Sequence, residues 1–119
     1  MDRKLEAALS VPVSEVKAEL FKALGHPARI RVLEVLSEGE HSVSDLQPLV
    51  GIESSHLSQQ LGILRRAGLV SSRKEGASVI YSLADPLLAD LLAAAKRLLI
   101  SSLAHTEELL ADLRTASPR

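Results

Sequence analysis

The spacing of apolar residues changes twice along this chain, and this change limits the fold more than any other feature. Up to Gly68, apolar residues recur at intervals of three or four, as on one face of a helix. The segments LVSSRK and SVIYSL that follow alternate apolar and polar residues, and KEGA joins them. Gly76 in this joint is free to adopt a positive φ, as tight hairpin turns require. Helical spacing then returns after Asp85 and Pro86. We therefore predict several helices, a β-hairpin with a charged tip, and one long helix.

The first two predicted helices have recognisable ends. Ser14 is the N-cap that we expect for the first helix, and Gly25 ends it. Pro27 starts the second helix, over about 27–37, because proline is favoured at the first helical position. His26 lies in the tight turn between them, where we expect a structural role.

A short third helix and a longer fourth helix complete the part before the hairpin. Ser42 or Ser44 caps the third helix, and Gly51 ends it. The fourth runs from about residue 54 to 67 and stops at Gly68. The predicted fold is mostly α with a β-hairpin wing, in the order ααααββα. This is the order of a winged helix-turn-helix, in which the third and fourth helices form the helix-turn-helix.

The composition allows one domain of packed helices. The chain of 119 residues can bury one modest core, and aromatic residues make up only 2% of it, so aliphatic side chains must fill that core. We expect a flexible N-terminal arm over 1–13, one domain over 14–113 and a frayed tail over 114–119. The N-terminus lacks the apolar core of a signal peptide, and no stretch approaches the roughly 18 apolar residues of a membrane span. We therefore expect a cytoplasmic protein with no membrane partner.

The first half of the fourth predicted helix carries short hydrogen-bonding side chains and no charge. In a helix-turn-helix, the second helix enters the major groove with its N-terminal residues toward the base edges. Glutamine can pair with adenine there, and serine can reach several base edges or a phosphate. The candidate base-reading residues are Ser54, Ser55, His56, Ser58 and Gln59.

Positive charge follows on the same stretch. From Ser54 to Ser78 the chain has four basic residues and one acidic residue, a net charge of +3, whereas the whole chain carries −1. A local basic face is what contact with DNA phosphates requires. A helix and a hairpin tip whose charges only keep the protein soluble would have the same composition, so the charge count leaves this alternative open. The candidate phosphate and wing contacts are Arg65, Arg66, Arg73 and Lys74.

Two blocks of the sequence resemble the ArsR family of dimeric winged-helix transcriptional repressors. They are FKALGHPARIRVLEVL and LSQQLGILRRAGLVSSRKEGASVIYSL, and the similarity runs from about Val16 to the end of the last helix. The resemblance implies that the fourth helix reads the operator and that the wing touches flanking DNA through Arg73 and Lys74. It also implies that the first and last helices build a homodimer. The expected function is sequence-specific binding of double-stranded DNA by a dimeric repressor at a palindromic operator.

The chain departs from the metal-sensing members of this family. Those members carry two cysteines in the third helix, where this sequence reads EHSVSDL, with Ser42 and Ser44 in their place. Serine hydroxyls are poor ligands for soft metals, and the chain has no cysteine for thiol redox chemistry either. Of the family's second metal site, on the last helix, only the later half is present, as His105 and Glu108. We expect no metal and no cofactor, and a zinc-responsive sensor built on these two residues is one alternative.

The last predicted helix has a leucine and alanine face too broad for the core of a monomer to cover. We expect this face to form the main dimer contact, with help from the first helix. The predicted interface residues are Leu20, Leu88, Leu91, Leu92, Ala95, Leu99 and Leu103.

An enzyme and a dimerisation module are the two alternatives to a DNA-binding regulator. An enzyme is excluded because Ser55 and His56 are adjacent and point to different faces, so they cannot form a nucleophile and base pair. The chain also lacks a glycine-rich phosphate loop. A dimerisation or protein-interaction module without operator binding is the second alternative, and Gln59 with the basic residues argues against it. The sequence leaves an effector open, either a small molecule or a partner protein.

Overall fold

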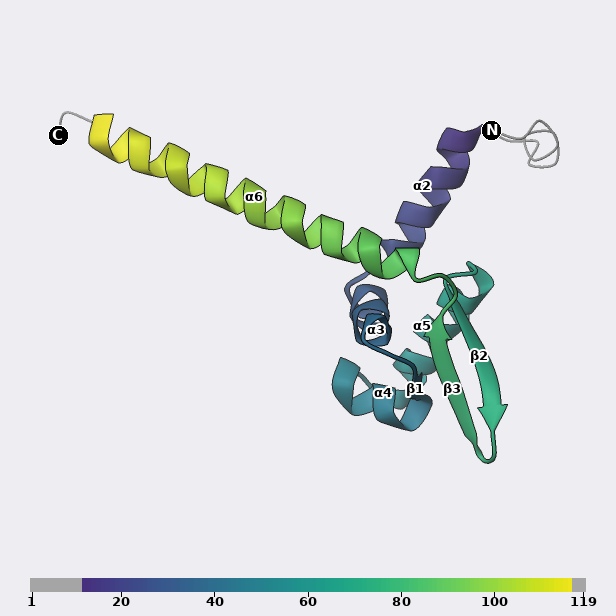
Figure 1. The fold of residues 1–119 in the computed structure, drawn as a ribbon. Helices are drawn as coiled ribbons and strands as arrows, with labels where there is room; N and C mark the ends of the chain where they lie inside the picture. Colours follow the sequence, from purple (N-terminus) through teal and green to yellow (C-terminus); the bar gives the residue numbers. More distant parts are fainter. Residues whose placement is uncertain (1–11, 117–119) are drawn as a thin grey trace. The chain divides into compact units, whose positions relative to one another are not determined.

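The computed structural model describes residues 12–116, which form five helices and a three-stranded antiparallel sheet (Figure 1). In chain order the elements are α2 (Val13–Leu24), α3 (Pro27–Ser37), β1 (His41–Ser42), α4 (Val43–Val50), α5 (Ser54–Arg66), β2 (Val70–Glu75), β3 (Ser78–Leu83) and α6 (Leu87–Ala116). The predicted winged helix-turn-helix is confirmed, with α4 and α5 as the helix-turn-helix and β2–β3 as the wing. The chain divides into two compact units that meet between Asp85 and Pro86, so α6 is described by itself.

The strand β1 is the one element of the described residues that the sequence did not indicate. It consists of two residues, and it pairs antiparallel with β3, His41 opposite Tyr81 and Ser42 opposite Ile80. The sheet order is β1-β3-β2, so β3 lies in the middle. A two-residue strand is too short to show an alternating pattern. It nevertheless fixes the start of α4 against the wing.

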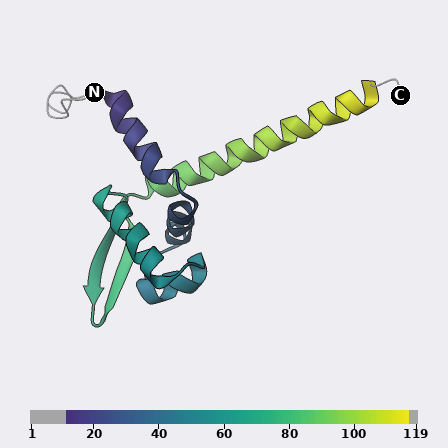
Figure 2. The same ribbon diagram turned by 180° about the vertical axis from the view of Figure 1, so that it is seen from behind.

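The core of residues 12–85 forms around α3. Val32 and Leu33 of this helix are fully buried, as are Leu57 and Leu64 on the inner face of α5. α3 contacts α2, α4, α5 and β3, while α5 and β2 lie side by side in both views of the ribbon (Figures 1 and 2). The apolar stripe of α5 therefore faces inward, and its opposite face is left to solvent.

The helix ends follow the predicted signals with one exception. Ser42 is the N-cap of α4, since its Oγ accepts a hydrogen bond from the amide of Asp45 at 3.1 Å. Gly51 ends α4 with a φ of 79°, which favours glycine. The prediction for Ser14 was wrong: α2 begins at Val13, and its N-cap is Pro12, two residues before Ser14 and without a side-chain capping hydrogen bond.

The termini differ in part from the predicted boundaries. The predicted arm over 1–13 lies outside the described residues except for Pro12 and Val13, and Val13 is already helical. At the other end, α6 continues to Ala116, so residues 114–116 of the predicted tail are helical. Local spacing does not mark this end, because no glycine or proline lies between Leu87 and Pro118 to stop the helix.

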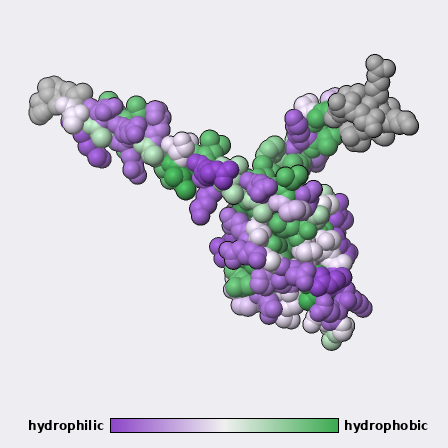
Figure 3. Space-filling model, in the orientation of Figure 1, coloured by the Kyte–Doolittle hydropathy of each residue, from purple (hydrophilic) through white to green (hydrophobic). Residues whose placement is uncertain are grey.

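Taken by itself, α6 is a 30-residue helix whose apolar side chains lie at the surface (Figure 3). Its large exposed apolar side chains are Leu87, Leu98, Leu99, Ile100, Leu103, Leu109, Leu110 and Leu113. Despite this content, no helix among residues 12–116 is both long enough and apolar enough to cross a membrane.

Candidate nucleic-acid interface

Four of the five predicted base-reading residues are exposed on the first two turns of α5. The side chains of Ser54, Ser55, Ser58 and Gln59 lie at the surface, whereas Leu57 between them is fully buried. The helical period thus separates a polar outer face from an apolar inner face. No acidic residue lies in the first turn of α5, so the amide groups at its N-terminus meet no intrahelical carboxylate. A carboxylate does lie beside this end, on the N-cap residue Glu53, which is exposed and makes no side-chain capping hydrogen bond, whereas the face formed by the four polar residues carries no charge.

His56, the fifth predicted base reader, lies differently. It is half-buried, and its ring stands edge-on to the ring of His26, with the centroids 6.0 Å apart. The Nδ1 of His26 accepts a hydrogen bond from the amide of Ala28 at 3.1 Å, which makes His26 the N-cap of α3. The structural role expected for His26 is confirmed. His56 therefore links the start of α5 to the start of α3.

A buried polar contact below the outer face was missed by the sequence analysis. Gln60 is only 5% exposed, and its Oε1 accepts a hydrogen bond from Nη1 of Arg29 at 3.0 Å. The same guanidinium donates to the carbonyl of Ala23 at 2.6 Å and to that of Lys22 at 3.4 Å. Arg29 thus joins the end of α2 to the middle of α5. The sequence signal was a glutamine on the apolar stripe of α5, beside Leu57 and Leu61.

A second arginine of α3 fixes the helix that precedes α5. Arg31 donates from Nε to the carbonyl of Val50 at 3.0 Å and from Nη2 to that of Leu49 at 3.2 Å. These carbonyls belong to the last turn of α4, where a helix leaves its acceptors unpaired. Arg29 and Arg31 together hold both helices of the helix-turn-helix on α3.

The predicted phosphate contacts on α5 lie at its C-terminal end. Arg65 and Arg66 are exposed in the last turn. Nη1 of Arg65 lies 3.5 Å from Oγ of Ser72 on β2, and the guanidinium of Arg66 lies over Gly62. A methyl group at Gly62 would come 3.3 Å from Nη1 of Arg66. Arg65 therefore adds positive charge between α5 and the wing, and Arg66 adds it along α5.

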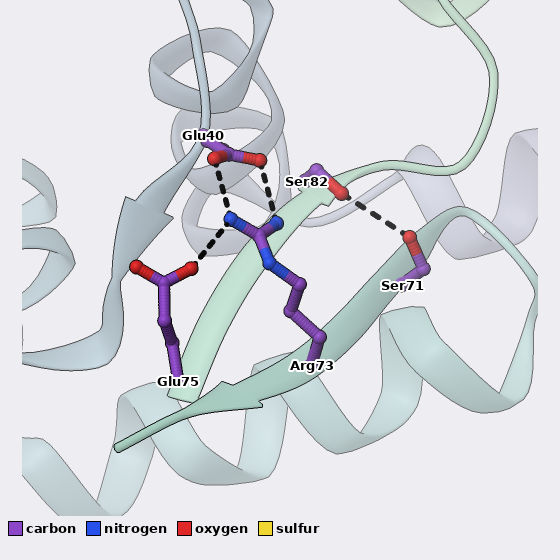
Figure 4. Close-up of polar contacts among 5 residues, drawn as sticks. All are labelled: Glu40, Ser71, Arg73, Glu75 and Ser82. Carbon is purple, nitrogen blue, oxygen red and sulfur yellow. Dashed lines mark hydrogen bonds and ion pairs between the residues drawn. The ribbon is translucent and has the colours of Figure 1, made fainter. Parts of the chain in front are cut away.

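The two predicted wing contacts are in different surroundings. Lys74 is exposed, and no salt bridge joins it to a carboxylate in the described part of the chain. Arg73 instead lies between two carboxylates (Figure 4). It donates to both carboxylate oxygens of Glu40, at 2.7 and 2.8 Å, and to Glu75 at 2.9 Å.

These contacts shift the pKa values of Glu40 and Arg73. Hydrogen bonds from Arg73 hold the pKa of the Glu40 carboxyl below its usual value, with a smaller contribution from charge attraction. Glu40 and Glu75 in turn raise the pKa of Arg73. All three side chains are about half exposed or more, so water screens their attraction. Arg73, Glu40 and Glu75 together carry a net charge of −1. Arg73 therefore adds no net positive charge to the wing in the free protein.

The predicted dimer residues fall into three groups in a single chain. Leu88 is buried, at 8% exposure, so little of its side chain is left for a partner. Leu20, Leu91 and Leu92 are half-buried, and Ala95, Leu99 and Leu103 are exposed.

Leu20 also borders a cavity within residues 12–85. The cavity has a volume of about 610 Å³. It is lined by Val16, Glu19, Leu20, Lys22, Ala23, Arg29, Ile63, Ala67 and Leu69. Most of this surface is apolar and comes from α2, from Ile63 of α5 and from the segment between α5 and β2.

His105 and Glu108 are the two candidate metal ligands on α6. Among residues 12–116, no three His, Asp or Glu side chains are grouped so that they could hold a metal ion. His105 and Glu108 are exposed on α6.

The sequence matches the model of one protein family, described as bacterial regulatory protein, arsR family, over residues 26–72. This range runs from the N-cap of α3 into β2 and includes the whole helix-turn-helix.

Three known proteins show how far the similarity extends. An HTH-type transcriptional regulator of Mycobacterium tuberculosis, Rv0081, is 53% identical over 106 residues, covering 88% of this chain and 93% of that protein. Its crystal structure superposes with a TM-score of 0.75 over 82% of this chain and 98% of that chain. A biofilm growth-associated repressor of Agrobacterium fabrum is 40% identical, over 72% of this chain and 77% of its own. The homodimeric winged helix-turn-helix domain of Mb0332 from Mycobacterium bovis is 28% identical, with a TM-score of 0.71 over 88% of this chain and 93% of that domain.

Proposed function

Because the chain belongs to the ArsR family of bacterial regulatory proteins, we propose that it is a homodimeric repressor that reads a palindromic operator with the exposed face of α5. The family is one of DNA-binding transcriptional regulators and not of enzymes. The observation that carries the proposal is the uncharged, hydrogen-bonding outer face of α5, backed by a buried apolar face that fixes its direction.

Different residues would perform different parts of DNA binding. Ser54, Ser55, Ser58 and Gln59 would contact base edges; their exposure on the first two turns of α5 supports this role. His56 would mainly orient this end of the helix, because its ring lies against His26. Arg65, Arg66 and Lys74 would contact phosphates, which fix the register of the protein on DNA without reading sequence.

The dimer would bring two copies of α5 to one face of the DNA. Exposed leucines of α6 support such an interface, since a helix with this apolar surface is stabilised when a second chain covers it. The cavity beside Leu20 offers a further apolar surface that the second copy could cover. The homodimeric state described for Mb0332 is consistent with this assembly.

The effector, if the protein has one, would differ from those of the metal-sensing members. The chain has no cysteine, so arsenic, cadmium or lead cannot bind through thiolates and no thiol can respond to oxidation. Neither alternative function gains support from a specific contact. Within the described residues of one chain no third His, Asp or Glu is grouped with His105 and Glu108, so a zinc site there would need ligands from a second chain, and the outer face of α5 is exposed.

Fluorescence anisotropy with DNA fragments recovered by selection from a genomic library tests the proposal. We expect saturable binding that weakens steeply with salt and is far tighter than binding to random DNA. A Ser58→Glu variant, which places a carboxylate on the outer face, should lose both specific and nonspecific binding while keeping its circular dichroism spectrum. If wild-type protein binds all fragments equally weakly, the chain is a dimerisation module and the proposal is wrong.

A further inference from the structure

Glu40 and Arg73 are 33 positions apart in sequence but form an ion pair with two hydrogen bonds, at 2.7 and 2.8 Å (Figure 4). The guanidinium donates two parallel hydrogen bonds to one carboxylate, which is the most directional geometry of such a pair. Glu40 directly precedes β1, whereas Arg73 lies on β2. Since the sheet order is β1-β3-β2, the pair connects the two outer strands across β3.

The register of the sheet explains why this contact forms. Arg73 is opposite Ile80 of β3, and Ile80 is opposite Ser42 of β1, so these three residues share one face of the sheet. Glu40 lies two positions before Ser42, and Glu75 two positions after Arg73. A period of two places both carboxylates on the face of Arg73.

Lys74 belongs to the opposite face of the wing. It shares that face with Val70, which is buried, and with Ser72, which accepts a hydrogen bond from Arg65 of α5. This face is therefore the one turned toward α5. Arg73 is on the other face, beside the Ser71–Ser82 contact at 3.2 Å (Figure 4).

The charges around Arg73 and Lys74 also distinguish the two faces of the wing. A phosphate that approached Arg73 would also approach two carboxylates, and the group of three carries a net negative charge. Lys74 and Arg65 have no such carboxylate partners in the described residues. The favourable path for DNA phosphates thus lies on the α5 side of the wing.

We propose that Glu40 and Arg73 are positioning residues that fix the wing against the start of β1, and that Arg73 does not contact phosphate in the DNA complex. This inference rests on the proposed function, because it assigns roles within the same DNA interface. Lys74 is left as the phosphate contact of the wing. Glu40 contributes to DNA affinity although its charge is negative, because a fixed wing loses less conformational freedom on binding.

The test measures operator affinity against salt for four variants: Glu40→Gln, Arg73→Met, Lys74→Gln and the charge exchange E40R/R73E. Both side chains are exposed and water screens their attraction, so Glu40→Gln and Arg73→Met should each weaken binding by no more than about fivefold at fixed salt. Neither should change the slope of log K against log salt. Lys74→Gln should reduce that slope by about 0.9 for each phosphate that the lysine neutralises in the wild type. The charge exchange keeps opposite charges at positions 40 and 73 but puts two carboxylates, at 73 and 75, next to each other on one face of β2, so it should recover part of the affinity that the single variants lose.

Two results would overturn the inference. One is a fall in salt slope for Arg73→Met that matches the fall for Lys74→Gln, which would make Arg73 a phosphate contact. The other is tighter binding by Glu40→Gln, which would make Glu40 an inhibitor of DNA binding.

Amide hydrogen exchange on the free protein separates this inference from the proposed function. Glu40→Gln should speed exchange at the tip of β2 and β3, even if no operator is found. Unchanged exchange in the wing would refute the positioning role, whereas failure of the wild type to bind any DNA would refute only the proposed function.

Discussion

The contact between Arg29 and Gln60 should be one of the largest single contributions of a polar pair to the stability of this fold. Gln60 is 95% buried, and its Oε1 accepts one hydrogen bond, from a charged donor at 3.0 Å. Hydrogen bonds to charged groups contribute about 1.5–3 kcal/mol. Gln60→Leu removes the acceptor and leaves part of the guanidinium without a partner. We expect it to lower the free energy of unfolding by about 1.5–3 kcal/mol.

Arg29→Met should cost more, because it also leaves a backbone acceptor unpaired. The side chain donates to the carbonyl of Ala23 at 2.6 Å, in addition to Gln60. This second bond also has the charged guanidinium as its donor and contributes about 1.5–3 kcal/mol, so the expected decrease is about 3–6 kcal/mol. In the double variant R29M/Q60L neither partner of the Arg29–Gln60 bond is left unmatched, and only the backbone carbonyl of Ala23 stays unpaired, as in Arg29→Met. The decrease in the double variant should therefore be smaller than the sum of the two single decreases by about 1.5–3 kcal/mol.

Urea unfolding followed by circular dichroism measures these values, at one fixed protein concentration because dimer formation shifts apparent stability. Arg31→Met is the matched control, since Arg31 is also on α3 but donates only to backbone carbonyls of α4. Its effect should add to that of Gln60→Leu within about 0.5 kcal/mol. If Arg29→Met and Gln60→Leu are additive to the same degree, the two side chains are not coupled and the reasoning is wrong.

Three further predictions concern assembly, DNA reading and sensing. Leu99→Glu places a charge on the exposed apolar face of α6 and should give monomers that no longer bind the operator; a variant that stays dimeric by light scattering would show that the interface lies elsewhere. Gln59→Ala should relax base preference at one position per half-site, at a cost of about 1–3 kcal/mol for each base that is no longer bound, whereas Lys74→Ala should weaken binding to all sequences equally. Binding measured on a panel of single-base operator variants checks both expectations. A change of base preference in Lys74→Ala but not in Gln59→Ala would exchange the two roles. Zinc, cadmium or arsenite at micromolar concentration should leave operator affinity unchanged in an anisotropy titration; a zinc-dependent decrease that disappears in His105→Ala would restore a metal sensor.

The parts of the fold that depend on neighbours in sequence could be predicted. The alternating spacing after Gly68 identified the wing, and the side chain of Ser42 and the positive φ of Gly51 define the ends of α4 as expected. Such signals need only a few consecutive residues, because helix caps and hairpin turns are made by local hydrogen bonds.

The parts that depend on distant residues could not be predicted. Nothing near Arg73 in sequence shows that Glu40 will neutralise it, because that contact depends on the register of β1 with β3. Gln60 belongs to the same helix as the candidate base readers, yet its partner comes from α3. A charge count over consecutive residues therefore overstated the positive charge of the wing.

The candidate base readers show the same division. The helical period separates inner from outer positions on α5, so the exposure of Ser58 and Gln59 followed from spacing. The half-buried position of His56 did not, since it depends on the ring of His26 at the start of another helix.

Selection of binding sites from randomised double-stranded DNA tests the central claim most directly, because it assumes nothing about the operator. A dimer that places one α5 in each of two successive major grooves predicts an enriched motif with two-fold symmetry. The centres of its half-sites should be about one helical turn apart, roughly 10 base pairs. An enriched motif without two-fold symmetry, or no enrichment at all, would contradict the account.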